Sequence, residues 1–251
     1  MKKLFAGLMA VVMAGSLAAC GNSEETSGEG KEKIIMGTSA DFPPFETREN
    51  DGEIVGFDID LAKHITEELG YELEIKDMNF DGLIGALQAD TVDFVVSGMS
   101  ATDKRKENVD FSVEYHRSGE MFITLPDSEI ESMEDLDGVK LGVQLGTIQD
   151  EAAKKLSETI DLEVKSLDKL PALIQELKAG RIDAIYLDKT VAEGYIKELN
   201  LKGFEDESSV SPGMAIAFPK GSDKVEEFSK VIEEMKENGE LEKLEEKWLK
   251  E

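Results

Sequence analysis

The chain has 251 residues, with 55 acidic residues against 28 basic residues and a formal net charge of −27. This excess of negative charge excludes a nucleic-acid-binding protein, because nucleic acid is bound by a basic face. It favours a heavily solvated acidic surface, or a field that attracts a cationic solute. The single cysteine, Cys20, cannot form an internal disulfide, so the fold must be stabilised by its core alone.

The first residues are typical of an export signal. Lys2 and Lys3 precede an apolar run over residues 4–17, which is too short to span a membrane and suits a signal peptide. The run ends in Leu-Ala-Ala-Cys-Gly, which resembles the lipobox of bacterial lipoproteins. We therefore predict a signal peptide over 1–19, and a lipidated Cys20 with a polar flexible tether over 20–32. An ordinary signal peptide with an unpaired cysteine is the alternative.

The folded part is expected to begin near Lys33 with a strand over residues 34–36. The loop over 37–46 follows this strand, and its adjacent prolines make it stiff. A helix is expected to begin at Asp58, whose side chain suits an N-cap. Phe42 and Phe80 each lie in a loop beyond a predicted strand, so each is either a core residue or a platform for a ligand.

A run of small polar residues follows the buried strand predicted over residues 92–96. It reads Ser97-Gly98-Met99-Ser100-Ala101-Thr102-Asp103-Lys104-Arg105. In α/β sheets, ligands bind beyond the carboxyl ends of the strands. Gly98 allows close approach of the backbone, Ser100 offers a hydroxyl, and the planar guanidinium of Arg105 suits a carboxylate. The alternative is a strand-to-helix turn that carries a surface arginine.

Residues 83–98 align without gaps on residues 173–188, and both segments have the pattern of helix, tight turn and buried strand. The offset of 90 residues is too long for a solenoid repeat, so we infer two similar α/β lobes. In this alignment Asp188 is equivalent to Gly98. One lobe thus offers a cation for a carboxylate and the other an anion for an ammonium. An α-amino acid carries both groups and could be held between the lobes.

The second lobe is expected to repeat the plan of the first. A strand over 139–143 leads through Gln144 to a helix that extends to Leu156, and the amides of Thr147 and Ile148 lie at its N-terminus, where an anion is favoured. Alternatively, Thr147 only caps this helix. Further elements are helices over 173–179 and 189–199, and a strand over 214–218 that returns to the first lobe. We assign residues 33–118 and 214–251 to lobe 1 and residues 119–213 to lobe 2.

Five segments, in this order, give the chain a family resemblance. They are Gly-Phe-Asp-Ile-Asp-Leu-Ala at 56–62, the serine-rich segment with Arg105, Val-Asp-Phe-Ser at 109–112, Val-Gln-Leu-Gly-Thr at 143–147, and residues 183–188. From about Lys33 to its C-terminus the chain resembles the extracellular solute-binding proteins that serve bacterial ABC importers of polar amino acids. The segments over residues 37–46 and 238–248 are most similar to arginine-binding lipoproteins of Gram-positive bacteria. The resemblance implies the two-lobed, type II periplasmic-binding-protein fold with a two-strand hinge.

The resemblance also implies roles for single residues. The α-carboxylate of the ligand would be bound by Arg105, Ser100 and the amide of Ile148. The α-ammonium would be bound by Asp188 and the carbonyl of Gly98. Phe42 and Phe80 would enclose the ligand side chain. The polar residues that could bind the end of the ligand side chain are Ser39, Asp41, Glu46, Ser97, Gln144 and Gln149. His116 departs from the family, which often has tyrosine there, and Ile148 replaces a residue that is often Thr, Ser or Gly.

These features together predict a binding protein without cofactor, metal or catalytic residues. It would be a monomer anchored to the extracellular face of the bacterial membrane through Cys20, and it would deliver its ligand to an ABC permease. Arginine, lysine, ornithine or histidine is favoured, since acidic residues suit a cationic side chain. Glutamine, histidine or cystine is the alternative ligand. There are two alternative functions. One is a sensor subunit, and the other is an enzyme on the same fold that uses Glu120 or His116 as its acid.

Overall fold

The computed structural model describes residues 31–250, so the predicted signal peptide, Cys20 and most of the predicted tether lie outside the described residues. Residues 31 onward form one compact unit, which contains two five-stranded sheets and one small sheet. Within 31–250, no helix is both long enough and apolar enough to cross a bilayer. The predicted α/β class is therefore confirmed.

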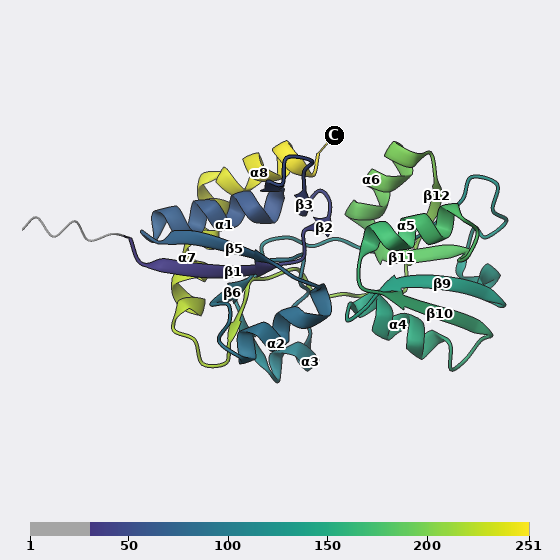
Figure 1. Cartoon of the computed structure of the whole chain (residues 1–251), viewed down its shortest axis with the longest axis horizontal. Helices are drawn as coiled ribbons and strands as arrows, with labels where there is room; N and C mark the ends of the chain where they lie inside the picture. Colours follow the sequence, from purple (N-terminus) through teal and green to yellow (C-terminus); the bar gives the residue numbers. More distant parts are fainter. Residues whose placement is uncertain (1–30, 251) are drawn as a thin grey trace, which may run out of the picture. The chain divides into compact units, whose positions relative to one another are not determined.

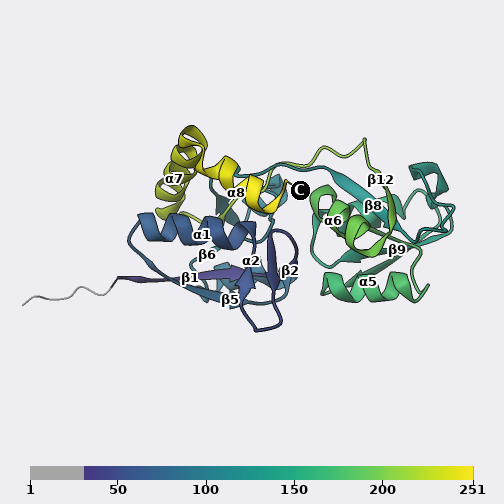
Figure 2. The ribbon, with the colours of Figure 1, turned by 90° about the horizontal axis from the view of Figure 1, so that it is seen from above.

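The first sheet forms the centre of lobe 1 (Figure 1). Its strand order is β5 (Glu72–Asp77), β1 (Lys33–Thr38), β6 (Phe94–Val95), β13 (Ala217–Pro219) and β7 (Val109–Phe111). β1 is parallel to β5 and β6, whereas β13 is antiparallel to its neighbours. Helices α1 (Phe57–Glu68) and α8 (Glu240–Trp248) lie on one side of this sheet, and α2 (Leu83–Gln88) and α3 (Asp103–Lys106) lie on the other. Figure 2 shows α7 (Lys224–Asn238) and α8 beside α1.

The second sheet forms the centre of lobe 2. Its strand order is β10 (Leu162–Leu167), β9 (Val139–Gln144), β11 (Ala184–Asp188), β8 (Glu120–Thr124) and β12 (Lys202–Glu205). Figure 1 shows α4 (Ile148–Leu156) on one side, with α5 (Leu170–Lys178) and α6 (Lys189–Leu199) on the other. Short 3-10 turns lie at Phe80–Gly82 and Met133–Leu136. Each sheet is thus covered on both faces, which explains why its central strands are nearly all apolar.

The repeat detected in the sequence corresponds to the same structural unit in both lobes. Asp93 accepts a hydrogen bond from the backbone N–H of Ile35 at 2.7 Å, and its equivalent, Asp183, accepts one from Lys140 at 2.8 Å. The turn residues Asp90 and Gly180 are also equivalent, and their φ angles are 51° and 64°. The two copies therefore share two features. One is a carboxylate that anchors the neighbouring strand, and the other is a left-handed turn.

The structure corrects several expectations. α1 begins one residue earlier than expected, with Gly56 as its N-cap residue, and the side chain of Asp58 is buried instead of capping the helix. The segment expected as one loop contributes to a small sheet, with β2 (Asp41–Phe42), β3 (Glu46–Arg48) and β4 (Ile54–Val55). Helix α5 begins three residues earlier than expected, with Pro171 in its first turn, where its missing N–H costs nothing. β12 was not anticipated.

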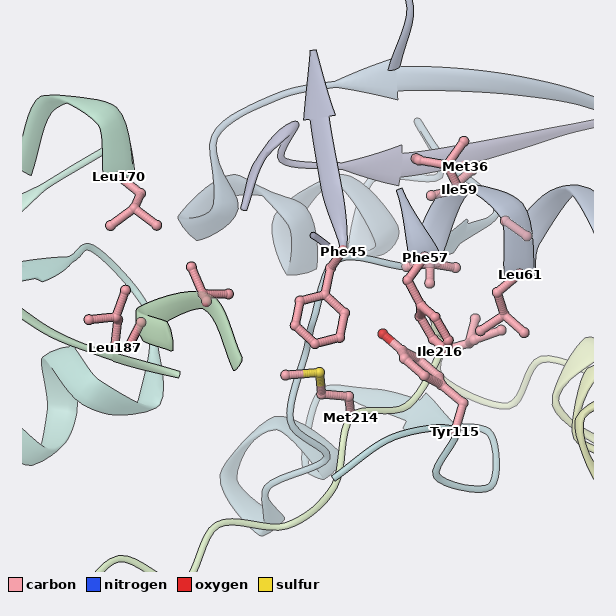
Figure 3. Packing of buried hydrophobic residues seen from close by; sticks show 14 of the residues in the cluster. Met36, Phe45, Phe57, Ile59, Leu61, Tyr115, Leu170, Leu187, Met214 and Ile216 are labelled. Atoms are coloured by element: carbon pink, nitrogen blue, oxygen red, sulfur yellow. The ribbon is translucent and has the colours of Figure 1, made fainter. Parts of the chain in front are cut away.

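Two segments connect the sheets, one between β7 and β8 and the other between β12 and β13. They pair at Met214, whose N–H donates to the carbonyl of His116 at 2.8 Å and whose carbonyl accepts from Tyr115 at 2.9 Å. Figure 3 shows the Met214 side chain against the ring of Phe45, with Phe57 and Tyr115 nearby. The crossing is thus tied to the core of lobe 1. The exact lobe boundaries, 118/119 and 213/214, stay a prediction.

Candidate functional site

One cavity is lined by all fourteen residues that we predicted for the binding site. The predicted residues in its wall are Ser39, Asp41, Phe42, Glu46, Phe80, Ser97, Gly98, Ser100, Arg105, Gln144, Thr147, Ile148, Gln149 and Asp188. They come from both lobes, so the cavity exists only where the two lobes meet. The roles of the single residues remain predictions.

Arg105 is the cation of this cavity, and α3 and the preceding turn hold it. Thr102 caps α3 by accepting from the N–H of Arg105, and the guanidinium donates to the carbonyls of Ser100 at 2.9 Å and Gly146 at 3.1 Å. Burial lowers the pKa of Arg105 to about 10. Within 31–250, no carboxylate forms an ion pair with this guanidinium. A partly buried arginine without an ion-pair partner suits the carboxylate of a ligand.

Asp188 is buried at the end of β11, and its carboxylate accepts from the N–H of Thr190 at 2.8 Å as the N-cap of α6. Burial raises its pKa to about 7. Glu120 lies beside it, because the two residues are register partners on β8 and β11. Glu120 accepts from Gln149 and from Ser211, and burial raises its pKa to about 8. This end of the cavity is thus prepared for a positive group.

The aromatic side chains of Phe42 and Phe80 both lie in the cavity wall, where a platform for the ligand side chain has to be. The guanidinium of Arg105 lies over the ring of Phe80, with 5.3 Å between its central carbon and the ring centroid. Phe80 therefore orients Arg105 as well as bordering the cavity. Phe42 packs against Gly98, where a Cβ atom would lie 3.0 Å from its ring. Gly98 has a φ of 52°, so glycine is required there for both conformation and space.

Asp41 makes its contacts mainly across the cavity to lobe 2. One carboxylate oxygen accepts from the backbone N–H of Leu170 at 2.9 Å, and both accept from the side-chain amide of Gln144, at 3.2 and 3.4 Å. Ser39 donates to the same carboxylate at 2.8 Å. Leu170 is the first residue of α5, and this helix has no capping bond from its own N-cap residue, Lys169. Asp41 therefore caps a helix of the opposite lobe.

Glu46 is a buried residue of the cavity wall, next to the segment that carries Ser97 and Gly98. It accepts from the hydroxyl of Ser97 at 2.7 Å, and that hydroxyl accepts from the N–H of Ser39 at 3.0 Å. Burial raises the pKa of Glu46 well above its usual value, and the negative charge of Asp58 adds to the effect. The two acidic residues that we predicted at the side-chain end therefore differ, since protein donors surround Asp41 and far fewer reach Glu46.

At the N-terminus of α4, Thr147 accepts from the N–H of Asp150 at 3.1 Å, so its capping role holds, and it also lines the cavity. Ile148 occupies the first helical position, where the backbone N–H has no intrahelical partner. His116 does not line the cavity. It lies in the crossing segment with its ring 5.4 Å from that of Phe45 and its Nδ1 3.8 Å from Glu245 of α8.

Five lining residues were not predicted: Ser118, Glu120, Ser211, Pro212 and Met214. Four of them belong to the crossing segments, whose position depends on the packing of the lobes, so no sequence signal marks them. Glu120 did carry a signal. It is a carboxylate at the start of an otherwise apolar buried strand, a position that costs free energy unless it serves a purpose.

Comparison with known proteins supports this picture. The family model of the bacterial extracellular solute-binding proteins, family 3, matches residues 34–251. The chain belongs to this family. The chain is 46% identical to the arginine-binding extracellular protein ArtP of Bacillus subtilis over 251 residues, which cover 99% of this chain and 98% of that protein. It is 34% identical to a probable histidine-binding protein of Campylobacter jejuni, with 95% of each chain covered.

Solved structures of the family agree with the two-lobed fold. An ancestral arginine-binding protein bound to arginine superposes with a TM-score of 0.81 at 40% identity, covering 87% of this chain and 99% of that one. The same kind of ancestral protein bound to glutamine gives a TM-score of 0.82 at 41% identity, covering 88% and 99%. The fold also includes an ancestral amino acid-binding protein that is a precursor of cyclohexadienyl dehydratase, with a TM-score of 0.80, 35% identity, and 86% and 95% covered.

The site contains no arrangement typical of a metal centre. In the part of the chain that the structure describes, no group of three or more His, Cys, Asp or Glu side chains could hold a metal ion. The polar groups of the cavity are carboxylates, hydroxyls, amides and one guanidinium. Such groups recognise charge and hydrogen-bonding pattern, and the relatives named above are described as binding proteins.

Proposed function

We propose that this protein captures arginine, or another amino acid with a cationic side chain, and delivers it to an ABC importer. The observation that carries the proposal is the imbalance of charge in the cavity wall. Four carboxyl groups, of Asp41, Glu46, Glu120 and Asp188, face a single cation, Arg105. An α-amino acid compensates Arg105 with its carboxylate and Asp188 with its ammonium. Negative charge then remains, and a cationic side chain would balance it.

Arginine-binding and histidine-binding relatives support the choice of a cationic ligand, and the anchoring at Cys20 and delivery to a permease follow from the family resemblance. Glutamine is the second candidate, because a protein of the same fold and 41% identity has been solved with glutamine bound. Cystine is a further candidate from the sequence. Arginine and glutamine differ in one property that can be tested, the charge of the ligand side chain.

A thermal-shift panel tests the proposal on the chain beginning at Gly21, with the common amino acids, ornithine, cystine and citrulline. Citrulline has nearly the shape of arginine but no side-chain charge. A ligand at 1,000 times its dissociation constant adds about 4 kcal/mol to the free energy of unfolding. We expect the largest shift from arginine and a much smaller one from citrulline. Equal shifts from arginine and citrulline, or a shift from glutamine alone, would contradict cationic specificity but not amino-acid binding.

A further inference from the structure

Two carboxyl groups are completely buried next to the cavity, and each has an oxygen without a hydrogen-bond donor. Glu46 and Asp58 are 1% and 0% exposed. One oxygen of Asp58 accepts from the N–H of Gly98 at 2.7 Å and from the hydroxyl of Tyr115 at 2.9 Å, and one oxygen of Glu46 accepts from Ser97. The remaining oxygens, Oε2 of Glu46 and Oδ1 of Asp58, have no donor among the described residues.

The two carboxyl groups are neighbours, because Ser97 and Gly98, which donate to them, are consecutive residues, and the negative charge of Asp58 acts on Glu46. A carboxylate is only an acceptor, so one group can satisfy an oxygen of the other only if one of them carries a proton. A shared proton also satisfies the two oxygens that lack a donor. Burial raises the pKa of Asp58 to about 6 and that of Glu46 well above its usual value, in agreement with this geometry. Two neighbouring carboxyl groups that are both fully buried do not ionise together near neutral pH.

Among residues 31–250, no cation is in direct contact with the pair. From β2, Asp41 faces Glu46 and adds negative charge, and from the crossing segment the hydroxyl of Tyr115 faces Asp58. Lys169 of lobe 2 reaches only as far as Ser39, at 3.1 Å. His116 packs on the ring of Phe45, with its Nδ1 toward Glu245. A positive charge that entered the cavity beside Glu46 would therefore lower the cost of removing the proton.

The cavity has a second acidic pair, which is electrostatically separate from the first. The neighbouring charges that act on Glu120 are those of Asp188 and Asp206, whereas those that act on Glu46 are Asp58 and Asp41. In the proposed binding mode the ligand ammonium lies at Asp188, so the Glu120 pair responds to every α-amino acid. The Glu46 pair lies beside Ser39, Ser97 and Asp41, the predicted side-chain end. It responds to the charge of the side chain.

We propose that Glu46 and Asp58 hold one proton between them in the ligand-free protein and release it when a cationic side chain enters the cavity. The pair then carries a single negative charge before binding and two negative charges when the cation is present. A neutral side chain leaves the proton in place. The inference rests on the proposed function, and it makes the carboxyl pair the element that adapts the cavity to the charge of its ligand.

Calorimetry of the purified protein at pH 7, in two buffers with different ionisation enthalpies, measures the number of protons released on binding. The ligands are arginine and citrulline, so any contribution from the α-ammonium end is the same for both. We expect arginine to release more protons than citrulline, with a difference of at most about one, because the pair holds one proton. We also expect the ratio of arginine to citrulline affinity to rise between pH 5.5 and 8.5, by up to about tenfold per pH unit.

Glu46→Gln provides the decisive variant, because its amide can donate to the free oxygen of Asp58 as the shared proton does, while its carbonyl still accepts from Ser97. The arginine–citrulline difference in proton release should vanish, and the affinity ratio should lose its pH dependence. Glu49→Gln, an exposed substitution in the neighbouring turn, should retain both. Equal proton release by the two ligands in the unaltered protein, or a difference that persists in Glu46→Gln, overturns the shared proton. Absence of heat with arginine instead overturns the proposed function and the inference together.

Discussion

Arg105 shows how much the surroundings of a single side chain determine its use. Its guanidinium donates to two backbone carbonyls and lies over Phe80, so its position is fixed before any ligand arrives. Its charge nevertheless lacks a carboxylate partner within residues 31–250. A preorganised cation of this kind loses little entropy on binding and gains an ion pair in a site of low dielectric.

Replacing Arg105 by alanine is expected to weaken amino-acid binding by roughly 2–5 kcal/mol, because the ligand carboxylate would be buried without a partner. Isothermal calorimetry with arginine measures the loss. Lys106→Ala is the matched control, since Lys106 is an exposed cation of the same helix whose ion pair, with Asp103, is 3.8 Å long and local. A loss below about 1 kcal/mol for Arg105→Ala would show that the carboxylate is bound elsewhere.

Asp188 caps α6 and is predicted to bind the ligand ammonium, and Asp188→Asn separates the two roles. Asparagine is as good an N-cap as aspartate, so α6 should keep its cap and the free energy of unfolding should change by less than about 1 kcal/mol. The negative charge is lost, and binding should weaken by roughly 2–5 kcal/mol. Chemical denaturation and calorimetry measure the two quantities. Wild-type affinity in Asp188→Asn would exclude this carboxylate as the partner of the ammonium.

At the scale of the elements, the capping of α5 by Asp41 links the two lobes. A helix N-terminus favours a carboxylate through its free N–H groups and its dipole. Here the carboxylate comes from β2 of lobe 1, so the cap exists only when the lobes are close together. Gln144 strengthens the same contact from β9. The prediction that Asp41 binds the end of the ligand side chain stands untested, and its contacts give it a second role, in stabilising the closed arrangement.

Asp41→Ala distinguishes these two roles. If Asp41 stabilises closure, the substitution should weaken binding of arginine and citrulline by the same factor, roughly 1–2 kcal/mol for a lost cap, and should speed ligand release. If Asp41 instead binds the cationic end, arginine alone should lose affinity. Stopped-flow release and calorimetry with both ligands decide between the two, and Asp51→Ala in an exposed turn is the control.

At the scale of the whole molecule, the buried acids make stability depend on pH. Burial raises the pKa values of Asp58, Asp188 and Glu120 to about 6, 7 and 8, whereas unfolded Asp and Glu titrate near 4. Between these limits the folded state binds more protons than the unfolded state, so its stability falls as pH rises. Repulsion within a chain of net charge −27 acts in the same direction.

The ligand-free protein is therefore expected to be more stable at pH 5.5 than at pH 8, as measured by guanidinium denaturation. Each fully titrating group contributes up to about 1.4 kcal/mol per pH unit. Glu120→Gln should reduce the dependence of stability on pH, because it removes the group with the highest of the three pKa values. Saturating arginine should also flatten it, since the ligand ammonium compensates the carboxylates. Stability that rises over this range would contradict the assignment of these acids as buried and protonated.

The sequence alone determined the class of fold, the repeat and fourteen of the residues that line the cavity. Strand and helix periods depend on local spacing, and the repeat preserved the anchoring aspartates 93 and 183, so both could be recognised without coordinates. Loops at the carboxyl ends of parallel strands meet at one edge of a sheet, which pointed to Gly98, Ser100, Arg105 and Asp188. The family resemblance implied the polar positions at the side-chain end.

Tertiary structure alone decided which of these groups already have partners. Asp41 and Glu46 look equivalent in the sequence, yet one caps a helix of the other lobe and the other interacts with Asp58. Asp58 had the pattern of an N-cap, but burial against Gly98 and Tyr115 gave it different donors. The donors that reach Asp41 and Asp58 from other elements lie about 40 to 130 positions away in the chain, and no local pattern encodes the desolvation and pairing that such contacts impose.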